Sequence, residues 1–83
     1  MNIGVYSILD RKAGAYGELL FFTNDAIAHR AIAEVMTQPS NYTKYPEDFD
    51  MYHVGFFDNE TGIIRPCEVR FVSRFADFVA KED

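Results

Sequence analysis

The chain is poor in cysteine, tryptophan and positive charge. It has one cysteine, no tryptophan and eight Lys and Arg against thirteen Asp and Glu, which gives a net charge of −5. A lone Cys67 cannot form an intrachain disulfide or a cysteine-based zinc cluster, so we expect a reducing compartment. A net charge of this sign excludes a protein that coats nucleic acid by charge alone. Any nucleic-acid site must therefore be a local patch.

Long hydrophobic runs and a targeting segment are also missing. The longest apolar run covers residues 19–22, far short of the roughly 20 residues that a membrane-spanning helix needs. The first nine residues lack the basic start of a signal peptide. We expect a soluble protein with no membrane partner.

The composition still provides enough material for a folded core. The 83 residues are 48% hydrophobic and 16% aromatic, with eight Phe and five Tyr. A chain of this length fits one small domain, because domains typically hold about 50–250 residues. We predict a single domain over residues 1–83.

Hydrophobic periodicity predicts two strands and a helix in the first half of the chain. Residues 2–9 alternate with a period of two, 10–17 read as a glycine-containing loop, and 19–22 form a short apolar strand. Capping residues at 23–25 then start a helix with apolar positions at i, i+3, i+4 and i+7. It should end near Gln38, because the following proline disfavours helical geometry.

The second half predicts a long loop and a hairpin. Residues 39–50 read as a polar loop, and 51–57 as a strand with Tyr52, Val54 and Phe56 on one face. A turn over 58–62 leads to a partner strand that Pro66 ends, followed by a further extended piece and a short helix. The predicted class is α+β. It is a small antiparallel sheet in β-β-α-β-β order, with one main helix packed on it and a short C-terminal helix.

Candidate catalytic and metal-binding groups are sparse. His29 and His53 lie in predicted regular elements with no nucleophile at a recognisable spacing, and we interpret both as structural or exposed. Cys67 precedes Glu68, whose charge disfavours a reactive thiolate. The acidic residues Glu47, Asp48 and Asp50 are read as a solvated loop face. We predict no enzyme activity, no metal and no cofactor.

The positive charges gather at the two ends of the chain. Arg11 and Lys12 share a loop with Tyr16, and Arg70 and Arg74 lie among phenylalanines near the C-terminus. If the first and last strands are neighbours, these five residues form one basic and aromatic surface. Cations for phosphates and rings for bases are the combination that single-stranded nucleic acid binding uses.

The residues alone favour a structural interpretation of the same positions over a binding surface. Arg70 and Arg74 can instead pair with Glu68 and Asp77 while the phenylalanines fill the core.

Four segments carry a resemblance to a known family. They are YSILDRKAGAYG at 6–17, NDAIAHRAIAEVM at 24–36, YPEDFDMYHVGFFDNETG at 45–62 and ADFV at 76–79. The chain resembles the small non-structural protein of gokushoviruses, single-stranded DNA bacteriophages of the Microviridae. The resemblance implies a protein of the infected bacterium's cytoplasm that binds DNA and acts in viral DNA replication, single-stranded genome synthesis or packaging. It implies no catalytic residues.

Two functions follow as expectations. In the first, the protein binds single-stranded DNA through Arg11, Lys12, Tyr16, Arg70 and Arg74. In the alternative, it is an interaction module that regulates a phage or host replication protein without direct DNA binding. We expect a homodimer in either case, because one helix cannot cover a four-stranded sheet that carries eight phenylalanines.

Overall fold

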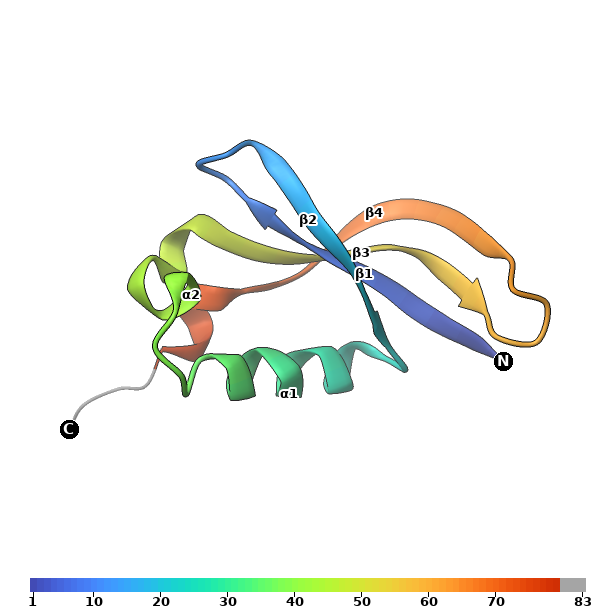
Figure 1. Ribbon diagram of the computed structural model, residues 1–83, viewed down its shortest axis with the longest axis horizontal. Coiled ribbons are helices and arrows are strands. Elements are labelled where there is room, and N and C mark those ends of the chain that lie inside the picture. The colour runs from blue at the N-terminus through green and yellow to red at the C-terminus, as the bar shows by residue number, and fades with distance from the viewer. Residues whose placement is uncertain (80–83) are drawn as a thin grey trace.

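Four antiparallel strands form one sheet, in the order β2-β1-β3-β4 (Figure 1). The computed structural model describes residues 1–79, and its extents are 47 × 26 × 18 Å. The strands are β1 (Asn2–Asp10), β2 (Ala15–Phe22), β3 (Phe49–Asp58) and β4 (Ile64–Arg74). The helical elements are α1 (Asp25–Val35), α2 (Asn41–Lys44) and the single 3-10 turns η1 (Pro46–Asp48) and η2 (Phe75–Phe78).

The main helix begins where the capping residues predict and ends earlier. The side chain of Asn24 accepts a hydrogen bond from the backbone N–H of Ile27, which satisfies one of the free donors of the first turn. At the other end, the hydroxyl of Thr37 donates to the carbonyl of Glu34 over 2.7 Å. This local bond competes with a further helical turn, so α1 stops at Val35 and does not reach residue 38.

The predicted loop at 39–50 contains two helical turns. Ser40 caps α2 in a capping box with Thr43, each side chain meeting the other residue's backbone. The strand that follows starts earlier than predicted, at Phe49.

Pro66 does not end the last strand. The pieces predicted on either side of it form one continuous β4 at the edge of the sheet. An edge strand tolerates proline because half of its backbone groups have no partner strand to pair with.

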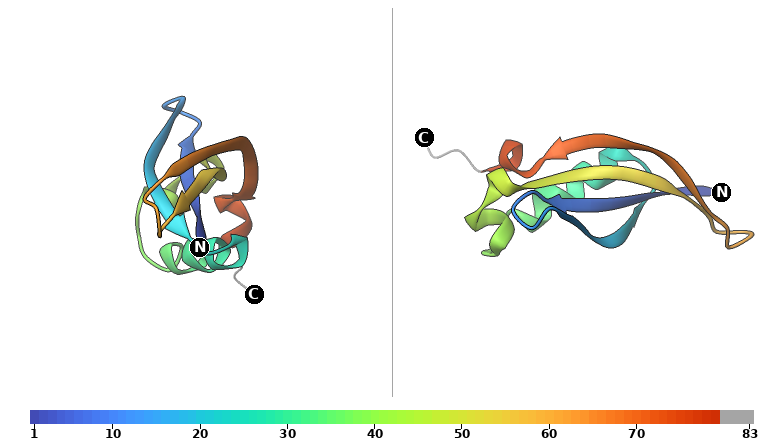
Figure 2. Two further views of the ribbon diagram at one scale, coloured as in Figure 1. Left: turned by 90° about the vertical axis from the view of Figure 1, so that its right-hand side faces the viewer. Right: turned by 90° about the horizontal axis from the view of Figure 1, so that it is seen from above.

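The core lies at one end of the molecule, between the sheet and the helical elements. The cluster of buried apolar side chains there consists of Tyr6, Ala28, Ile32, Met51 and Phe75. Val5 is buried as well, on the opposite face of β1. Beside them, the rings of Tyr42 and Phe49 each pack on Phe75, with centroids 5.0 and 6.2 Å away. Seen from above, α2 and η2 lie at the same end of the long axis (Figure 2).

The α+β prediction is wrong. Strands hold 48% of the described residues, and α1 is the sole helix of seven residues or more among them. The helix does not cover a face of the sheet: Ala28 and Ile32 are its two buried residues, and the β3–β4 hairpin extends well beyond its first turn (Figure 1). The predicted C-terminal helix is the single 3-10 turn η2.

A β-bulge in β3 reverses which side chains face the helix. Val5 and Tyr6 are adjacent in β1, but their partners Gly55 and His53 are two residues apart, so Val54 is an extra residue. Side chains before and after the bulge therefore follow opposite alternation.

Because of this reversal, the side chains of β3 are divided between the two faces differently from the prediction. Phe56 pairs with Gly4 on the side of Tyr6, whereas Phe57 pairs with Ile3 on the other side. The prediction that Tyr52 and Phe56 share a face is wrong for this reason.

Gly55, the glycine of β3, should not tolerate a side chain. A Cβ built there would lie 2.6 Å from the carbonyl oxygen of Arg65 in the neighbouring strand. We expect Gly55→Ala to lower the free energy of unfolding by about 1–3 kcal/mol, because backbone of a paired strand cannot move aside. Thermal unfolding followed by circular dichroism measures this, with about 4–8 °C expected per kcal/mol.

Gly17→Ala is the matched control. Its added Cβ would have Ile8 O at 3.7 Å as its nearest neighbour, an ordinary contact. Equal losses of stability in the two variants would contradict the expectation.

Candidate nucleic-acid interface

One face of the sheet carries no helix, and we call it the open face. Tyr6 and Met51 point from the sheet toward α1 in the core, so the residues that alternate with them point the opposite way. Cross-strand pairing orders the open face into four rows. From the β1–β2 turn outward, they are Tyr16, Leu9, Asp50 and Arg74; then Leu19, Ser7, Tyr52 and Phe71; then Phe21, Val5, Gly55 and Pro66; and last Ile3, Phe57 and Ile64.

Three aromatic rings cross the open face from β2 to β4. The ring of Tyr52 lies 5.6 Å from that of Tyr16 and 5.7 Å from that of Phe71, and both contacts are edge-on. Tyr16 is 48% exposed and Phe71 49%. We call these three residues the aromatic row. Its two outer rings are half exposed, and Tyr52 between them is partly buried.

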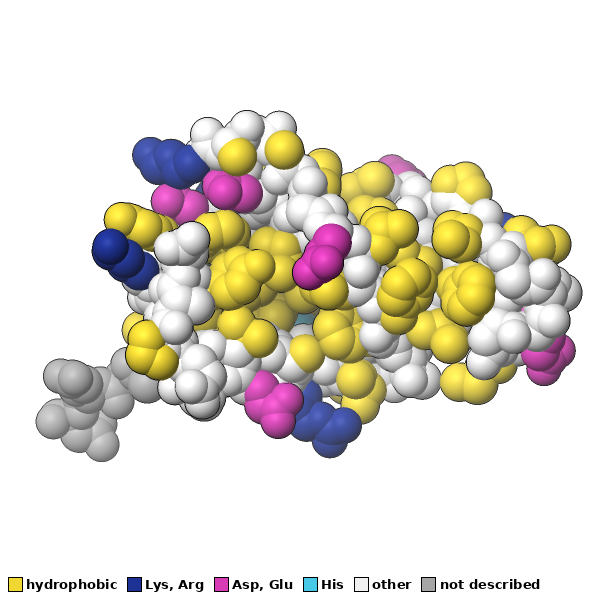
Figure 3. Space-filling model, viewed as in Figure 1, with side chains coloured by type: hydrophobic (Ala, Val, Ile, Leu, Met, Phe, Trp, Pro, Cys, Tyr) yellow, Lys and Arg dark blue, Asp and Glu magenta, His cyan; other side chains and the backbone are white. Residues whose placement is uncertain are grey.

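Apolar side chains continue beyond the aromatic row. Leu19, Phe21 and Ile64 are all about half exposed on the open face, and Phe21 packs edge-on against Phe57 at 5.9 Å. The view of Figure 3 has the orientation of Figure 1 and so includes α1 as well as the sheet; hydrophobic side chains gather in its middle and right, and most charged groups lie along the rim. Contiguous exposed apolar surface of this kind marks interaction sites in monomeric proteins.

Charged groups gather at the helical end of the open face. Arg11 Nε lies 3.5 Å from Asp50 Oδ2, and the Arg11 guanidinium also donates to the backbone carbonyl of Glu47. Arg74 donates to the carboxylate of Glu47 over 2.9 Å. Both arginine side chains remain about half exposed, so each can turn toward a ligand.

The structure brings together four of the five predicted binding residues. Arg11, Tyr16 and Arg74 share the helical end of the open face, and Lys12 is exposed in the adjoining β1–β2 turn. The first and last strands are not neighbours, because β3 lies between them. Arg70 is the exception, since it pairs with His53 on the helix side of the sheet.

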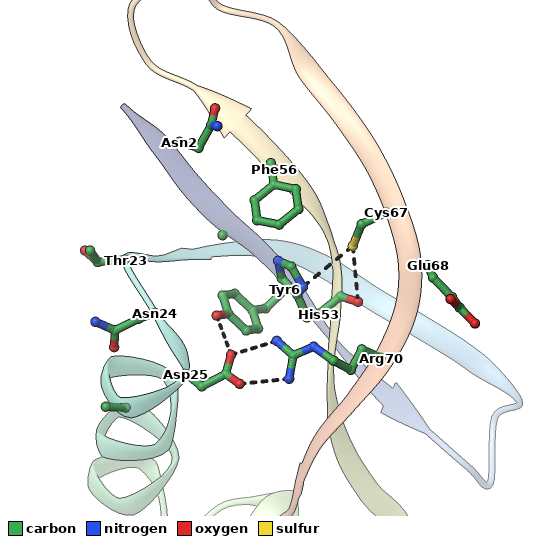
Figure 4. Close-up of a pocket in the computed structure, with 12 residues that line it drawn as sticks. Asn2, Tyr6, Thr23, Asn24, Asp25, His53, Phe56, Cys67, Glu68 and Arg70 are labelled. Atoms are coloured by element: carbon green, nitrogen blue, oxygen red, sulfur yellow. Dashed lines mark hydrogen bonds and ion pairs between the residues drawn. The ribbon is translucent and has the colours of Figure 1, made fainter.

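Arg70 belongs to a hydrogen-bonded network on the helix side (Figure 4). Its guanidinium donates two hydrogen bonds, of 2.8 and 3.0 Å, to the carboxylate of Asp25. The Tyr6 hydroxyl donates a third to the same carboxylate over 2.8 Å. The predicted pairing of Arg70 and Arg74 with Glu68 and Asp77 is therefore wrong.

The network shifts the ionisation of its members. Hydrogen bonds from Arg70 lower the pKa of Asp25 from 3.8 to about 2. Burial and the bond to this carboxylate raise the pKa of Tyr6 to about 12. Burial, helped by the charge of Arg70, lowers the pKa of His53, which favours the neutral imidazole.

A cavity of about 720 Å³ opens above this network. Tyr6 and His53 line it, with Phe56 and Cys67 beside them (Figure 4). Cys67 Sγ lies 3.6 Å from His53 Nδ1. Within residues 1–79, no group of three or more His, Cys, Asp or Glu side chains is placed to hold a metal ion.

Sequence reasoning misses two residues of the open face, Tyr52 and Asp50. Phe71 is one of the phenylalanines that the sequence already places beside the arginines near the C-terminus. Tyr52, however, is predicted only as a strand residue, although an aromatic residue in a strand is a signal for cross-strand pairing. Asp50 was assigned to a solvated loop, yet it lies in β3 and is 5% exposed. Because Glu47 and Asp48 precede it, Asp50 was interpreted as part of the same acidic loop.

Comparison with known proteins identifies the family. A family model described as Phage ORF5 protein matches residues 3–78. The chain belongs to this phage ORF5 family. Protein ORF5 of Chlamydia phage 1 is 35% identical over 78 residues, which cover 88% of this chain and 81% of the relative. The resemblance to a small protein of Microviridae phages is thereby confirmed. No solved structure matches the chain.

The described part of this ORF5 family member contains no helix with the length and apolar character needed to cross a membrane.

The Asp25 network predicts an acid-dependent loss of stability. The pKa of Asp25 is lower in the folded protein than in the unfolded chain, so on acidification the unfolded chain binds the proton first. The free energy of unfolding that this carboxylate contributes above about pH 4 should therefore be lost as the pH falls toward 2. Urea unfolding between pH 2 and 5 measures this. The Asp25→Asn variant should lose part of the pH dependence, and Arg70→Gln should weaken it by the same mechanism. Identical acid profiles for the wild type and Asp25→Asn would contradict the assignment.

Proposed function

We propose that this phage protein binds single-stranded DNA on its open face, with the aromatic row as the stacking platform. The observation that carries the proposal is the line of Tyr16, Tyr52 and Phe71 across the sheet, with ring centroids 5.6 and 5.7 Å apart. Unstacked bases pack on such rings, and each base contributes about 1–3 kcal/mol. The bases of duplex DNA are stacked on one another and cannot pack on these rings, so we expect the aromatic row to bind single-stranded DNA more tightly than duplex DNA.

Charge has a secondary role in the proposed site. Arg11, Lys12 and Arg74 lie at one end of the row and can meet the few phosphates that flank the stacked bases. The log of the affinity should change by about −0.7 per phosphate for each log unit of salt. With three cations and a net charge of −5, the expected salt dependence is shallow. Stacking supplies most of the binding energy.

The proposed role follows from the family and the site together. A protein of a single-stranded DNA phage that binds this form of DNA would act in the host cytoplasm. It would protect or direct the strand during genome synthesis or packaging.

Phe71→Leu tests the aromatic row. Leucine keeps an apolar side chain in β4 but removes the stacking ring, so the affinity for a labelled oligothymidine should fall about 5- to 150-fold. Fluorescence anisotropy at low and near-physiological salt measures the change.

Phe56→Leu is the matched control, because Phe56 is a similarly exposed phenylalanine on the opposite face. It should bind as the wild type does. Equal effects of the two substitutions would contradict the placement of the site.

A second candidate is the interaction module without DNA binding. One observation favours it: Arg11, Arg70 and Arg74 each have a carboxylate partner within 4 Å. The positive charges of this patch are neutralised, and the chain as a whole is acidic. Such a surface is better suited to contact a replication protein than a DNA phosphate backbone. Wild-type protein that binds neither single-stranded nor duplex DNA would favour this candidate.

We also propose that two copies associate along β2. This strand is one edge of the sheet and its residues are mostly exposed, so its unpaired backbone groups offer a template for a second β2. Pairing of this kind leaves the open faces of both copies free and side by side. Sedimentation should show a species of twice 9.5 kDa, and a single 9.5 kDa species at high concentration would refute the dimer.

A further inference from the structure

One buried carboxylate on the open face lacks a full set of hydrogen-bond partners. Asp50 is 5% exposed, and its Oδ1 is buried with no hydrogen-bond donor among the described residues. Its Oδ2 meets Arg11 Nε at 3.5 Å, well beyond the 2.7–2.9 Å of a strong charge-assisted bond. Leaving a buried charged acceptor unsatisfied is costly, so a donor from outside the protein would be favourable here.

Asp50 lies on the same face as the proposed stacking platform and next to it. It lies in the first row between Leu9 and Arg74, and Tyr52 of the aromatic row follows two positions along the same face and strand. A base stacked on Tyr52 or Phe71 extends beyond the ring, and its edge can reach the first row.

Arg11 is the group that would have to move. Its side chain is about half exposed, and its bond to Asp50 is long. A phosphate beside the stacked base would draw this guanidinium away and open the carboxylate. The two events are coupled, because the base edge then replaces the charge partner that Asp50 loses.

We propose that Asp50 selects guanine among the bases that stack on the aromatic row. This inference rests on the proposed function and adds a base preference to it. Guanine presents two adjacent donors, N1–H and the N2 amino group, on its Watson–Crick edge. One carboxylate accepts both in parallel, as it does from an arginine fork.

The other bases fit this acceptor less well. Adenine and cytosine each place a ring acceptor next to their amino group, which faces the second carboxylate oxygen and repels it. Thymine offers one N–H between two carbonyl groups. Guanine is therefore the base that satisfies both oxygens of Asp50.

Inosine provides the direct test on the wild-type protein, because it lacks the N2 amino group and is otherwise guanine. Three labelled oligothymidines of equal length are compared by anisotropy: one with a central dG, one with a central inosine, and one unsubstituted. A hydrogen bond to a charged group contributes about 1.5–3 kcal/mol, so we expect the dG oligonucleotide to bind at least about tenfold more tightly than the inosine one.

Asp50→Asn should bind the dG and inosine oligonucleotides equally, whatever its affinity for unsubstituted oligothymidine. Asp48→Asn is the matched control, since it removes the same charge from η1, outside the four rows. It should keep the preference for dG, and any general gain of affinity from the lost negative charge should appear in both variants.

The outcomes separate the two proposals. Equal binding of the dG and inosine oligonucleotides by the wild type would overturn the guanine preference while leaving single-stranded DNA binding intact. Asp50→Asn with an undiminished preference would show that another group reads the base, which also overturns it. Failure of the wild type to bind any of the three would refute the proposed function itself.

Discussion

The carboxylate of Asp25 joins three elements that are far apart in the sequence. It accepts from Tyr6 of β1 and from Arg70 of β4, and it lies at the first turn of α1. The helix buries few side chains against the sheet, so this polar connection fixes where its first turn sits. The network occupies the helix side of the sheet, and Arg70 is consequently unavailable to the opposite face. The sheet thus has one side held by a network and one side open to partners.

The open face follows from how little helical structure the chain contains. An α1 of eleven residues cannot cover a four-stranded sheet on both sides, so aromatic side chains on the second side stay half exposed. The same constraint concentrates charge at the helical end, where α2 and η1 bring Glu47 beside Arg11 and Arg74. The result is an exposed face with aromatic rings in the middle and paired charges at one end.

The sequence predicted local features well and long-range ones poorly. Alternation located β1 and most of β3, and the capping residues located the start of α1. The beginning of β2 was expected in a loop, and β4 was expected as two separate pieces. Arg11, Tyr16 and Arg74 do lie at one end of the open face, but the premise that put them together is wrong, because β3 lies between the first and last strands. The bulge at Val54 could not be predicted, since an extra residue has no local signature in a period-two pattern. Arg70 was misassigned because its partner Asp25 lies 45 residues away, and the fold class failed because periodicity does not show how much of a sheet a helix covers.

Pro66 has a consequence for how large an assembly can become. It lies in the edge strand β4, close to the irregular pairing between His53 and Gly55. A missing N–H and a bent strand make this edge unsuited to adding another strand along its length. The β2 edge is then the one left for the proposed pairing of two copies. Such a pairing would use that edge of both copies, so no edge would remain for a third copy and an open-ended fibre could not form.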